Sequence, residues 1–249
     1  MSEYSIIVKN VSKKFQLYHE KRTTIFESLV GTFNRKHHYE KLQVLDNISF
    51  EVKKGESFGI VGRNGSGKTT LLRILSHIYE ADTGSVETNG VVVPLLALGL
   101  GFHPELTATT NIYQSSILLG ISKNQIAESI DEIIEFAELE KFADVKLKNF
   151  SSGMAMRLAF ATAVQVDPSI LLLDEVMAVG DLNFQKKCEA VMMDFKKRGK
   201  SIVLVSHSPS SIEQLCDRAM FLKDGHIDAI GEPTAVLDSY VNYMDSLQK

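Results

Sequence analysis

Residues 62–69 carry the clearest chemical pattern in the chain. They fit the sequence G-x-x-x-x-G-K-[ST], in which glycines let the backbone turn its N–H groups towards phosphates. Lys68 would contact the β- and γ-phosphates, and the hydroxyl of Thr69 would bind Mg²⁺. An ordinary glycine-rich turn is the alternative, but an apolar run precedes the pattern and a helical pattern follows it. We therefore predict a nucleoside triphosphate site made by Gly62, Arg63, Asn64, Gly65, Ser66, Gly67, Lys68, Thr69 and Thr70.

A second group of candidate residues follows apolar runs in the other half of the chain. Residues 170–173 are all Ile or Leu, which predicts a central parallel strand buried on both faces. Asp174 ends this strand and would hold Mg²⁺, because a carboxylate at the tip of a buried strand needs a cation partner. Glu175 would orient and deprotonate an attacking water, and a solvated surface glutamate is the alternative. His207 follows the next predicted strand and would contact the γ-phosphate, unless it is simply a packed histidine.

The elements that position these residues alternate between strands and helices. Strands are predicted over 4–11, 45–52, 58–61, 85–88, 91–96, 170–173 and 201–205, with turns at 82–84 and 89–90. Helices are predicted from the phosphate loop to about Tyr79 and over 187–198. This order predicts a doubly wound α/β core that binds ligands at the carboxyl edge of its sheet.

Two regions depart from this alternation. From residue 97 to residue 166 helices dominate, and Ser122 with Gln125 forms a capping-box pattern, so we predict a helical insertion between two halves of the core. The end of the chain predicts a hairpin over Asp224 and Gly225 and a helix from Pro233. One face of that helix would carry the apolar residues Val236, Leu237, Tyr240, Val241, Met244 and Leu247.

Composition limits the classes of partner. The chain has 249 residues, of which 44% are hydrophobic, and a net charge of −4 that offers no overall basic field for nucleic acid. Two cysteines, Cys188 and Cys216, lie in apolar patterns and are predicted to be reduced core thiols. The sequence has neither a signal-peptide pattern nor an apolar run of membrane-spanning length, so we expect any membrane role to be peripheral.

A polar stretch between the first two strands contains a short helical pattern. Its apolar residues are Ile25, Phe26, Leu29, Val30 and Phe33, and the basic residues Arg35, Lys36 and Lys41 follow. One hypothesis is a surface helix folded onto its own domain. The other is a helix under the membrane, with its basic end against anionic head groups.

Taken together, these motifs and their order resemble the nucleotide-binding subunit of an ABC transporter. The resemblance covers the phosphate loop, the signature region around Ser151, Ser152 and Gly153 with Arg157 beyond it, the Asp174–Glu175 pair, the D-loop around Gly180 and Asp181, and His207. It implies a P-loop NTPase core of the ABC type with an antiparallel β subdomain and an inserted α-helical subdomain. It also implies one domain over 1–249, with the core in 1–96 and 167–230, the helical subdomain in 97–166 and a C-terminal helix in 231–249.

The resemblance further implies how ATP and Mg²⁺ are bound. Ser151, Ser152 and Gly153 would face the phosphate loop of a second copy, giving a head-to-tail homodimer with two ATP molecules between the subunits. Phe15 would stack on the adenine, and Tyr18 is the alternative. Base stacking on an aromatic ring is worth about 1–3 kcal/mol.

In two departures from the usual family pattern, this chain resembles polysaccharide exporters. Residues 95–104 lack the glutamine that usually couples to the transmembrane partner. His103 is a candidate to replace it, and a plain loop histidine is the alternative. The first loop is also long. We therefore expect an ATPase on the cytoplasmic side of the cell membrane that drives export of O-antigen, capsule or teichoic acid polymers through a separate permease, without binding nucleic acid or the polymer itself. A soluble ABC-type ATPase without a permease is the alternative.

Overall fold

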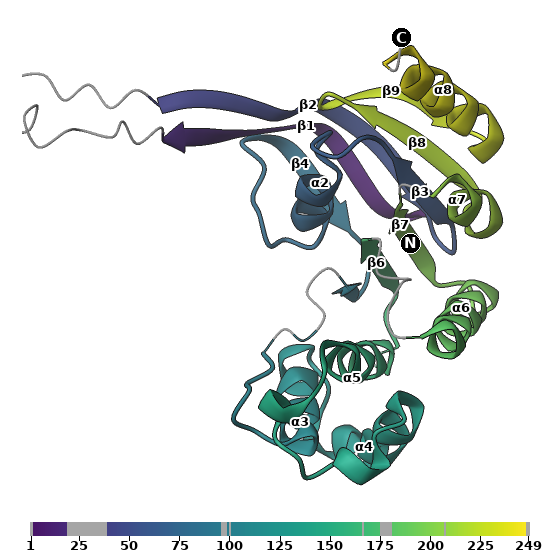
Figure 1. The fold of residues 1–249 in the computed structure, drawn as a ribbon. Coiled ribbons are helices and arrows are strands. Elements are labelled where there is room, and N and C mark those ends of the chain that lie inside the picture. Colours follow the sequence, from purple (N-terminus) through teal and green to yellow (C-terminus); the bar gives the residue numbers. More distant parts are fainter. Residues whose placement is uncertain are drawn as a thin grey trace, which may run out of the picture.

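The computed structural model describes residues 2–18, 39–95, 99, 101–165, 167–174, 181–206 and 208–247. Its central feature is a six-stranded sheet (Figure 1). The strand order is β5 (Val92–Pro94), β6 (Ile170–Asp174), β7 (Ser201–Val205), β3 (Ser57–Val61), β8 (Arg218–Lys223) and β9 (His226–Gly231). All neighbours pair in parallel except β8 and β9, which form the predicted antiparallel hairpin.

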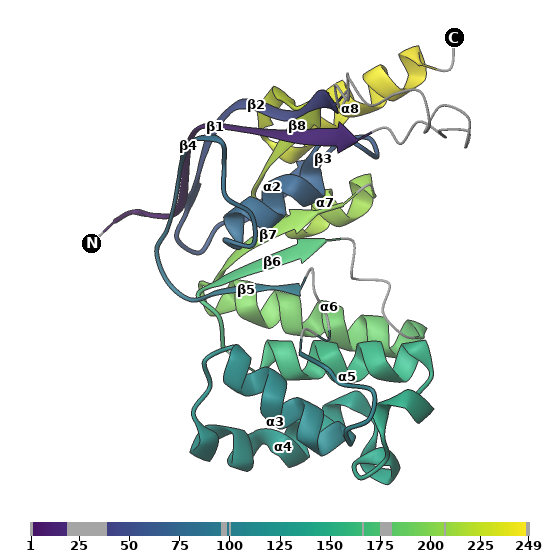
Figure 2. The ribbon, with the colours of Figure 1, turned by 90° about the vertical axis from the view of Figure 1, so that its left-hand side faces the viewer.

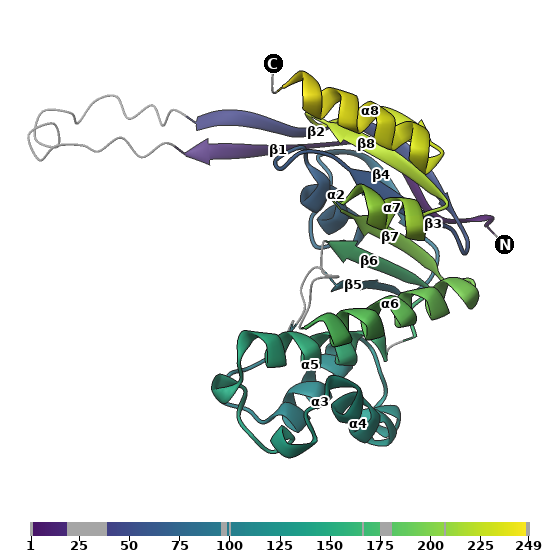
Figure 3. The ribbon, with the colours of Figure 1, turned by 45° about the vertical axis from the view of Figure 1, so that its right-hand side comes forward.

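Side chains alternate between the two faces of this sheet. On β6, Leu171 and Leu173 face one buried cluster, whereas Ile170 and Leu172 face the other. The first cluster includes residues of α6 (Leu182–Lys197), α7 (Pro209–Leu215) and α8 (Pro233–Ser246), which Figure 3 shows on one side of the sheet. Burial on both faces explains why this strand is a continuous apolar run.

The other face of the central sheet is covered by α2 (Lys68–Leu75) and a second sheet. This second sheet is antiparallel and has the order β2 (Tyr39–Lys53), β1 (Tyr4–Tyr18) and β4 (Thr83–Thr88). Both β1 and β2 are longer than the sequence pattern predicts, and their ends project from the body of the molecule as a two-stranded ribbon (Figure 1). After β4, the turn at Asn89 and Gly90 leads from this sheet to β5 of the central one.

Three helices form a separate lobe below the central sheet in Figure 2. They are α3 (Ala108–Leu118), α4 (Lys123–Ala137) and α5 (Ser152–Val164), and they share a buried apolar cluster of their own. Short 3₁₀ turns at Glu140–Phe142 and Leu147–Asn149 join α4 to α5. The predicted capping box at Ser122 and Gln125 is confirmed at the start of α4.

Several sequence predictions are wrong in detail. The helix after the phosphate loop ends at Leu75 instead of Tyr79, because His77 takes a left-handed conformation with φ of 56°. Helix α7 was not predicted. On α8, Val236, Leu237 and Tyr240 are buried as expected, but Val241 is exposed, as is Leu247 directly after the helix, so the buried stripe is narrower than the sequence suggests.

Candidate nucleotide site

The phosphate loop connects the end of β3 to the start of α2. Gly67 caps the helix with φ of 105°, a left-handed conformation that residues with a side chain rarely adopt. A Cβ atom at this position would also lie 2.8 Å from the carbonyl oxygen of Val44. Glycine is therefore required here both by the backbone conformation and by the close approach of β2. The resulting helix N-terminus directs its first N–H groups and a positive dipole end towards the loop.

Lys68 lies inside this loop and not on its surface. Its Nζ donates hydrogen bonds to the carbonyl oxygens of Gly62 at 2.6 Å and Arg63 at 2.9 Å. Only 6% of the residue is exposed. A buried ammonium group beside helix N–H groups makes this loop a site for a strongly anionic group such as a phosphate chain.

The structure brings Thr69 and Asp174 together from distant parts of the chain. Thr69 is in the first turn of α2, Asp174 ends β6, and the Oγ1 of Thr69 donates a hydrogen bond to the Oδ2 of Asp174 at 3.1 Å. A hydroxyl and a carboxylate are oxygen donors of the kind that Mg²⁺ prefers, and Mg²⁺ is usually held by one or two carboxylates together with substrate phosphates. Within the described part of the chain, no group of three or more His, Cys, Asp or Glu side chains could hold a metal by itself. The donor set therefore fits a Mg²⁺ ion that arrives with the phosphates.

A cavity of about 590 Å³ opens over the loop. Asp174 lines it together with the predicted residues Asn64, Gly65, Gly67, Lys68, Thr69 and Thr70. The cavity is also lined by Leu42 and Val44, which the sequence reasoning missed. Both are on β2, which reaches this position through its pairing with β1 and its contact with the turn between β8 and β9. No local motif could have identified them.

Phe15, the predicted adenine contact, lies on β1 directly opposite Leu42 of β2. Residues directly opposite each other in an antiparallel pair share a face of the sheet, so Phe15 and the cavity-lining Leu42 are on the same side. The ring of Phe15 contacts Tyr79 edge-on with 5.8 Å between ring centroids, and it does not itself line the cavity. Its role as an adenine contact stays a prediction, and the side chain of Tyr18 lies outside the described residues.

The signature residues begin α5 and lie apart from the phosphate loop. Ser151 caps the helix by accepting a hydrogen bond from the N–H of Met154 at 3.2 Å, and Ser151 and Ser152 are exposed. A Cβ atom at Gly153 would have only the Oγ of Ser151 within 4 Å, at 3.9 Å, so the backbone there is open. In Figures 1–3 this helix belongs to the lower lobe, and none of these three residues lines the phosphate-loop cavity. One chain thus presents two separate elements that could each bind phosphate.

Comparison with known proteins identifies the family. Residues 45–178 match the sequence profile described as ABC transporter. This chain belongs to the ABC transporter family. The span contains the phosphate loop and Asp174, which line the cavity, and also the signature residues at the start of α5.

Relatives within this family are named for polymer export. The chain is 40% identical over 240 residues to an O-antigen export system ATP-binding protein of Klebsiella pneumoniae, covering 94% of this chain and 96% of that protein. It is 42% identical over 245 residues to the protein of the same name from Myxococcus xanthus, covering 95% of this chain but only 55% of that protein. It is 39% identical over 241 residues to a teichoic acids export ATP-binding protein of Bacillus anthracis, covering 97% of this chain and 43% of that protein. The chain thus spans about half the length of two of these relatives.

A solved structure supports the fold. The chain resembles a dimeric ATP-binding cassette bound to ADP and phosphate, with a TM-score of 0.72 and 23% identity over 92% of this chain and 98% of that one. The predicted fold class, an ABC-type ATPase core with an antiparallel β subdomain and a helical subdomain, is confirmed. Among the described residues of this ABC ATPase, no helix has both the length and the apolar character needed to cross a membrane.

Asp181, which the resemblance places in the D-loop, caps helix α6 in this family member. Its carboxylate accepts hydrogen bonds from the N–H groups of Phe184 at 3.0 Å and Asn183 at 2.9 Å, and the Phe184 bond is the main reason that its pKa is lowered. Arg157 of α5 pairs with Glu138 at the end of α4 at 3.2 Å, and Lys187 of α6 contacts the same carboxylate. These ion pairs join the signature helix to the helix that follows the D-loop. Gly180, Glu175 and His207 lie outside the described residues, so their predicted roles stay predictions.

His103 is not brought to the cavity in this ABC subunit. It is exposed, and its Nδ1 accepts a hydrogen bond from the N–H of Glu105 at 3.2 Å. The loop containing it is held by the buried Asn111, whose amide donates to the carbonyl oxygens of His103, Leu106 and Thr107. The structure therefore shows His103 as part of a braced loop and does not assign it to the phosphate site.

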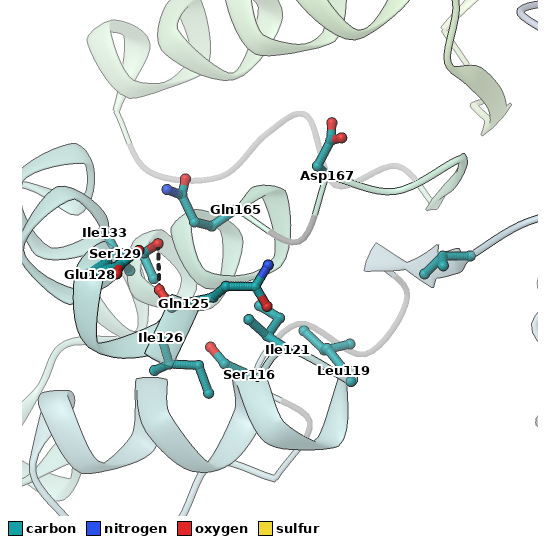
Figure 4. Close-up of a pocket in the computed structure, with 12 residues that line it drawn as sticks. Ser116, Leu119, Ile121, Gln125, Ile126, Glu128, Ser129, Ile133, Gln165 and Asp167 are labelled. Carbon is teal, nitrogen blue, oxygen red and sulfur yellow. Dashed lines mark hydrogen bonds between the residues drawn. The ribbon is translucent and has the colours of Figure 1, made fainter. Parts of the chain in front are cut away.

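A second cavity, of about 340 Å³, lies between the helical lobe and the edge of the central sheet (Figure 4). Its walls come from α3, α4 and the segment after α5, and they include the acidic residues Glu128 and Asp167 but no lysine or arginine. Asp167 forms ion pairs with Arg198 at 2.8 Å and with Lys200 at 2.9 Å. The cavity over the phosphate loop, with Lys68, Thr69 and Asp174 in its walls, is the candidate nucleotide site of this ABC subunit.

Proposed function

We propose that this chain is the ATP-hydrolysing subunit of an ABC exporter that moves a lipid-linked polysaccharide across the cytoplasmic membrane. The observation that carries the chemistry is the convergence of Lys68, Thr69 and Asp174 on one cavity, because these groups supply a cation for the phosphates and oxygen donors for Mg²⁺. The polymer class is supported by the names of relatives that share about 40% identity with this chain.

Hydrolysis requires a base for the attacking water and a group that contacts the γ-phosphate. We assign these roles to Glu175, which directly follows Asp174, and to His207, which follows β7 next to β6 in the sheet. Both side chains would reach the carboxyl edge of the sheet, which is where open α/β sheets bind their ligands. Glu175 would take the proton of the attacking water, while Lys68 and Mg²⁺ would stabilise charge on the transferred phosphoryl group.

Each site is proposed to be completed by a second copy of the chain. The exposed N-terminus of α5, with Ser151, Ser152 and Gly153, offers a hydroxyl and N–H groups, and these residues do not line the phosphate-loop cavity of their own chain. Facing the phosphate loop of a second subunit would use these groups and enclose two ATP molecules. The dimeric neighbour supports this arrangement.

A separate membrane permease is the second proposed partner, and the subunit would be peripheral to the cytoplasmic face of the membrane. The test is to replace the wild-type gene in its host with a Glu175→Gln variant and to follow both surface polymer and its lipid-linked precursor. We expect surface polymer to fall and the precursor to accumulate, with a Glu213→Gln variant on α7 as the control. Normal surface polymer in the Glu175→Gln strain would contradict the export assignment. If no membrane protein co-purifies with the wild-type chain, the result would favour a soluble ATPase.

A further inference from the structure

The turn between β8 and β9 lies against the phosphate loop, although the two are far apart in the sequence. It consists of Asp224 and Gly225, with φ of 46° and 82°, between the paired residues Lys223 and His226. Two positive φ values in a two-residue loop are typical of a tight hairpin turn that follows the twist of its strands. The position of this turn is therefore defined by the hairpin itself.

Gly225 connects the phosphate loop to β2 by hydrogen bonds in both directions. Its N–H donates to the carbonyl oxygen of Ser66 at 3.2 Å, and its own carbonyl oxygen accepts from the N–H of Asp46 at 2.9 Å. Ser66 belongs to the phosphate loop, whereas Asp46 is on β2 two residues beyond the cavity-lining Val44. One residue of the turn thus holds two walls of the nucleotide cavity.

Close packing makes this connection tight. A Cβ atom at position 225 would lie 2.7 Å from the carbonyl oxygen of Val44, and one at Gly67 would lie 2.8 Å from the same oxygen. The Val44 carbonyl is therefore enclosed between a glycine of the turn and a glycine of the phosphate loop. A side chain at 225 would have to displace backbone, not a flexible side chain.

The β8–β9 hairpin packs against α8. Phe221 of β8 contacts Tyr240 and Tyr243 with ring centroids 5.4 Å and 5.6 Å apart, and the Nζ of Lys223 lies 4.5 Å from the centroid of the Tyr243 ring. These contacts fix β8 next to the turn. The turn is consequently held in a fixed position next to the phosphate loop.

We propose that Gly225 is a positioning residue for nucleotide binding: the β8–β9 turn sets the separation of the phosphate loop from the β2 wall without touching the nucleotide. The inference rests on nucleotide binding at the phosphate loop and not on the polymer that is exported. Small displacements of binding groups reduce productive contacts steeply, so the effect should appear in nucleotide affinity.

The test compares asparagine at two glycines. Asparagine tolerates positive φ, so a Gly225→Asn variant changes mainly the contact with Val44. Gly199 is the matched control, because its φ is 69° and an added Cβ atom would have no atom within 4 Å. We expect the Gly225→Asn variant to bind Mg-ADP at least about 10-fold more weakly than the wild type by calorimetry, and Gly199→Asn to stay within about 2-fold. Circular dichroism at the same temperature gives the folded fraction of each variant, which is used to correct its measured affinity for Mg-ADP.

Hydrogen exchange on the wild-type protein provides a second measurement that needs no variant. ADP binding should slow exchange of the Gly225 amide, because that N–H is bonded to the phosphate loop. If the Gly225→Asn variant does not fold, unchanged exchange at Gly225 on adding ADP would by itself overturn the proposal. If the Gly225→Asn variant binds ADP with wild-type affinity, the positioning role of Gly225 is wrong but the nucleotide site stands. If the wild-type protein does not bind ADP, both the positioning role and the nucleotide site are wrong.

Discussion

Replacement of Thr69 by valine tests the metal site most directly. Valine keeps the β-branched shape of threonine on α2 but removes the hydroxyl that donates to Asp174 at 3.1 Å. Thr69 is exposed in the cavity and Asp174 is only half-buried, so water can replace the lost bond in the free protein. Folding stability should fall little, by about 0.5–1.5 kcal/mol, the usual range for one hydrogen bond.

The effect on Mg-nucleotide binding should be larger. Hydrogen bonds and ligand contacts to charged groups contribute about 1.5–3 kcal/mol. Every 1.4 kcal/mol is a factor of about 10 in affinity, so we expect Mg-ADP to bind about 10- to 150-fold more weakly. In EDTA the hydroxyl has no metal to hold, so the variant and the wild type should bind ADP with similar affinity.

Calorimetry of ADP with and without Mg²⁺ measures this difference. A Thr70→Val variant is the matched control for the metal, because Thr70 is the next residue on α2 and lines the same cavity, but the phosphate-loop pattern places no metal-binding hydroxyl there. Any loss of ADP affinity in Thr70→Val should therefore be the same with and without Mg²⁺. Wild-type affinity for Mg-ADP in Thr69→Val would refute the metal assignment. An equal loss with and without Mg²⁺ would show that the hydroxyl acts on the loop and not on the metal.

Three other predictions concern turnover, acid stability and thiol reactivity. Glu175→Gln should bind ATP but hydrolyse it at least about 100-fold more slowly, because the amide cannot accept the water proton; a wild-type steady-state rate would exclude Glu175 as the base. The pKa of Asp82 is lowered, first by the hydrogen bond from Lys13 at 2.8 Å, so its contribution to the free energy of unfolding is present above its unfolded pKa of about 3.9 and is lost as pH falls through the lower folded pKa. Urea unfolding should therefore show Asp82→Asn less stable than the wild type at pH 7, with the difference shrinking towards pH 2; a constant difference would contradict this linkage. Burial raises the pKa of Cys188 and Cys216 to about 12, so neither should react with a thiol reagent at pH 8 until urea is added, and rapid labelling of the native protein would show that these side chains are accessible.

Features that depend on neighbouring residues along the chain were predictable. The phosphate loop, the capping box at Ser122 and the hairpin at Asp224 each use contacts within a few residues, so their residue types are visible as short patterns. The strand Ile170–Asp174 was predictable for a different reason: burial on both faces requires a continuous apolar run.

Features that depend on strand pairing, and the extents of two helices, were not predictable. Leu42 and Val44 enter the cavity through the pairing of β2 with β1, in a register that is interrupted by bulges, and such irregularities leave no simple alternation in the sequence. Helix α7 was missed because it has only seven residues, too few for a clear helical period. The early end of α2 was missed because apolar residues continue to Ile78 after the backbone has already turned at His77.

The sequence by itself determined the chemistry of this protein: a loop that binds phosphates, a carboxylate for a metal, and an order of motifs that identifies an ABC ATPase. The tertiary structure decided how these parts meet. Thr69 reaches Asp174, and Gly225 contacts Ser66, through strands that lie next to one another in the sheet and far apart in the chain. A covalent sequence specifies local conformation and donor groups, but the distance between two donors depends on strand order, register and close packing, which are properties of the folded chain as a whole.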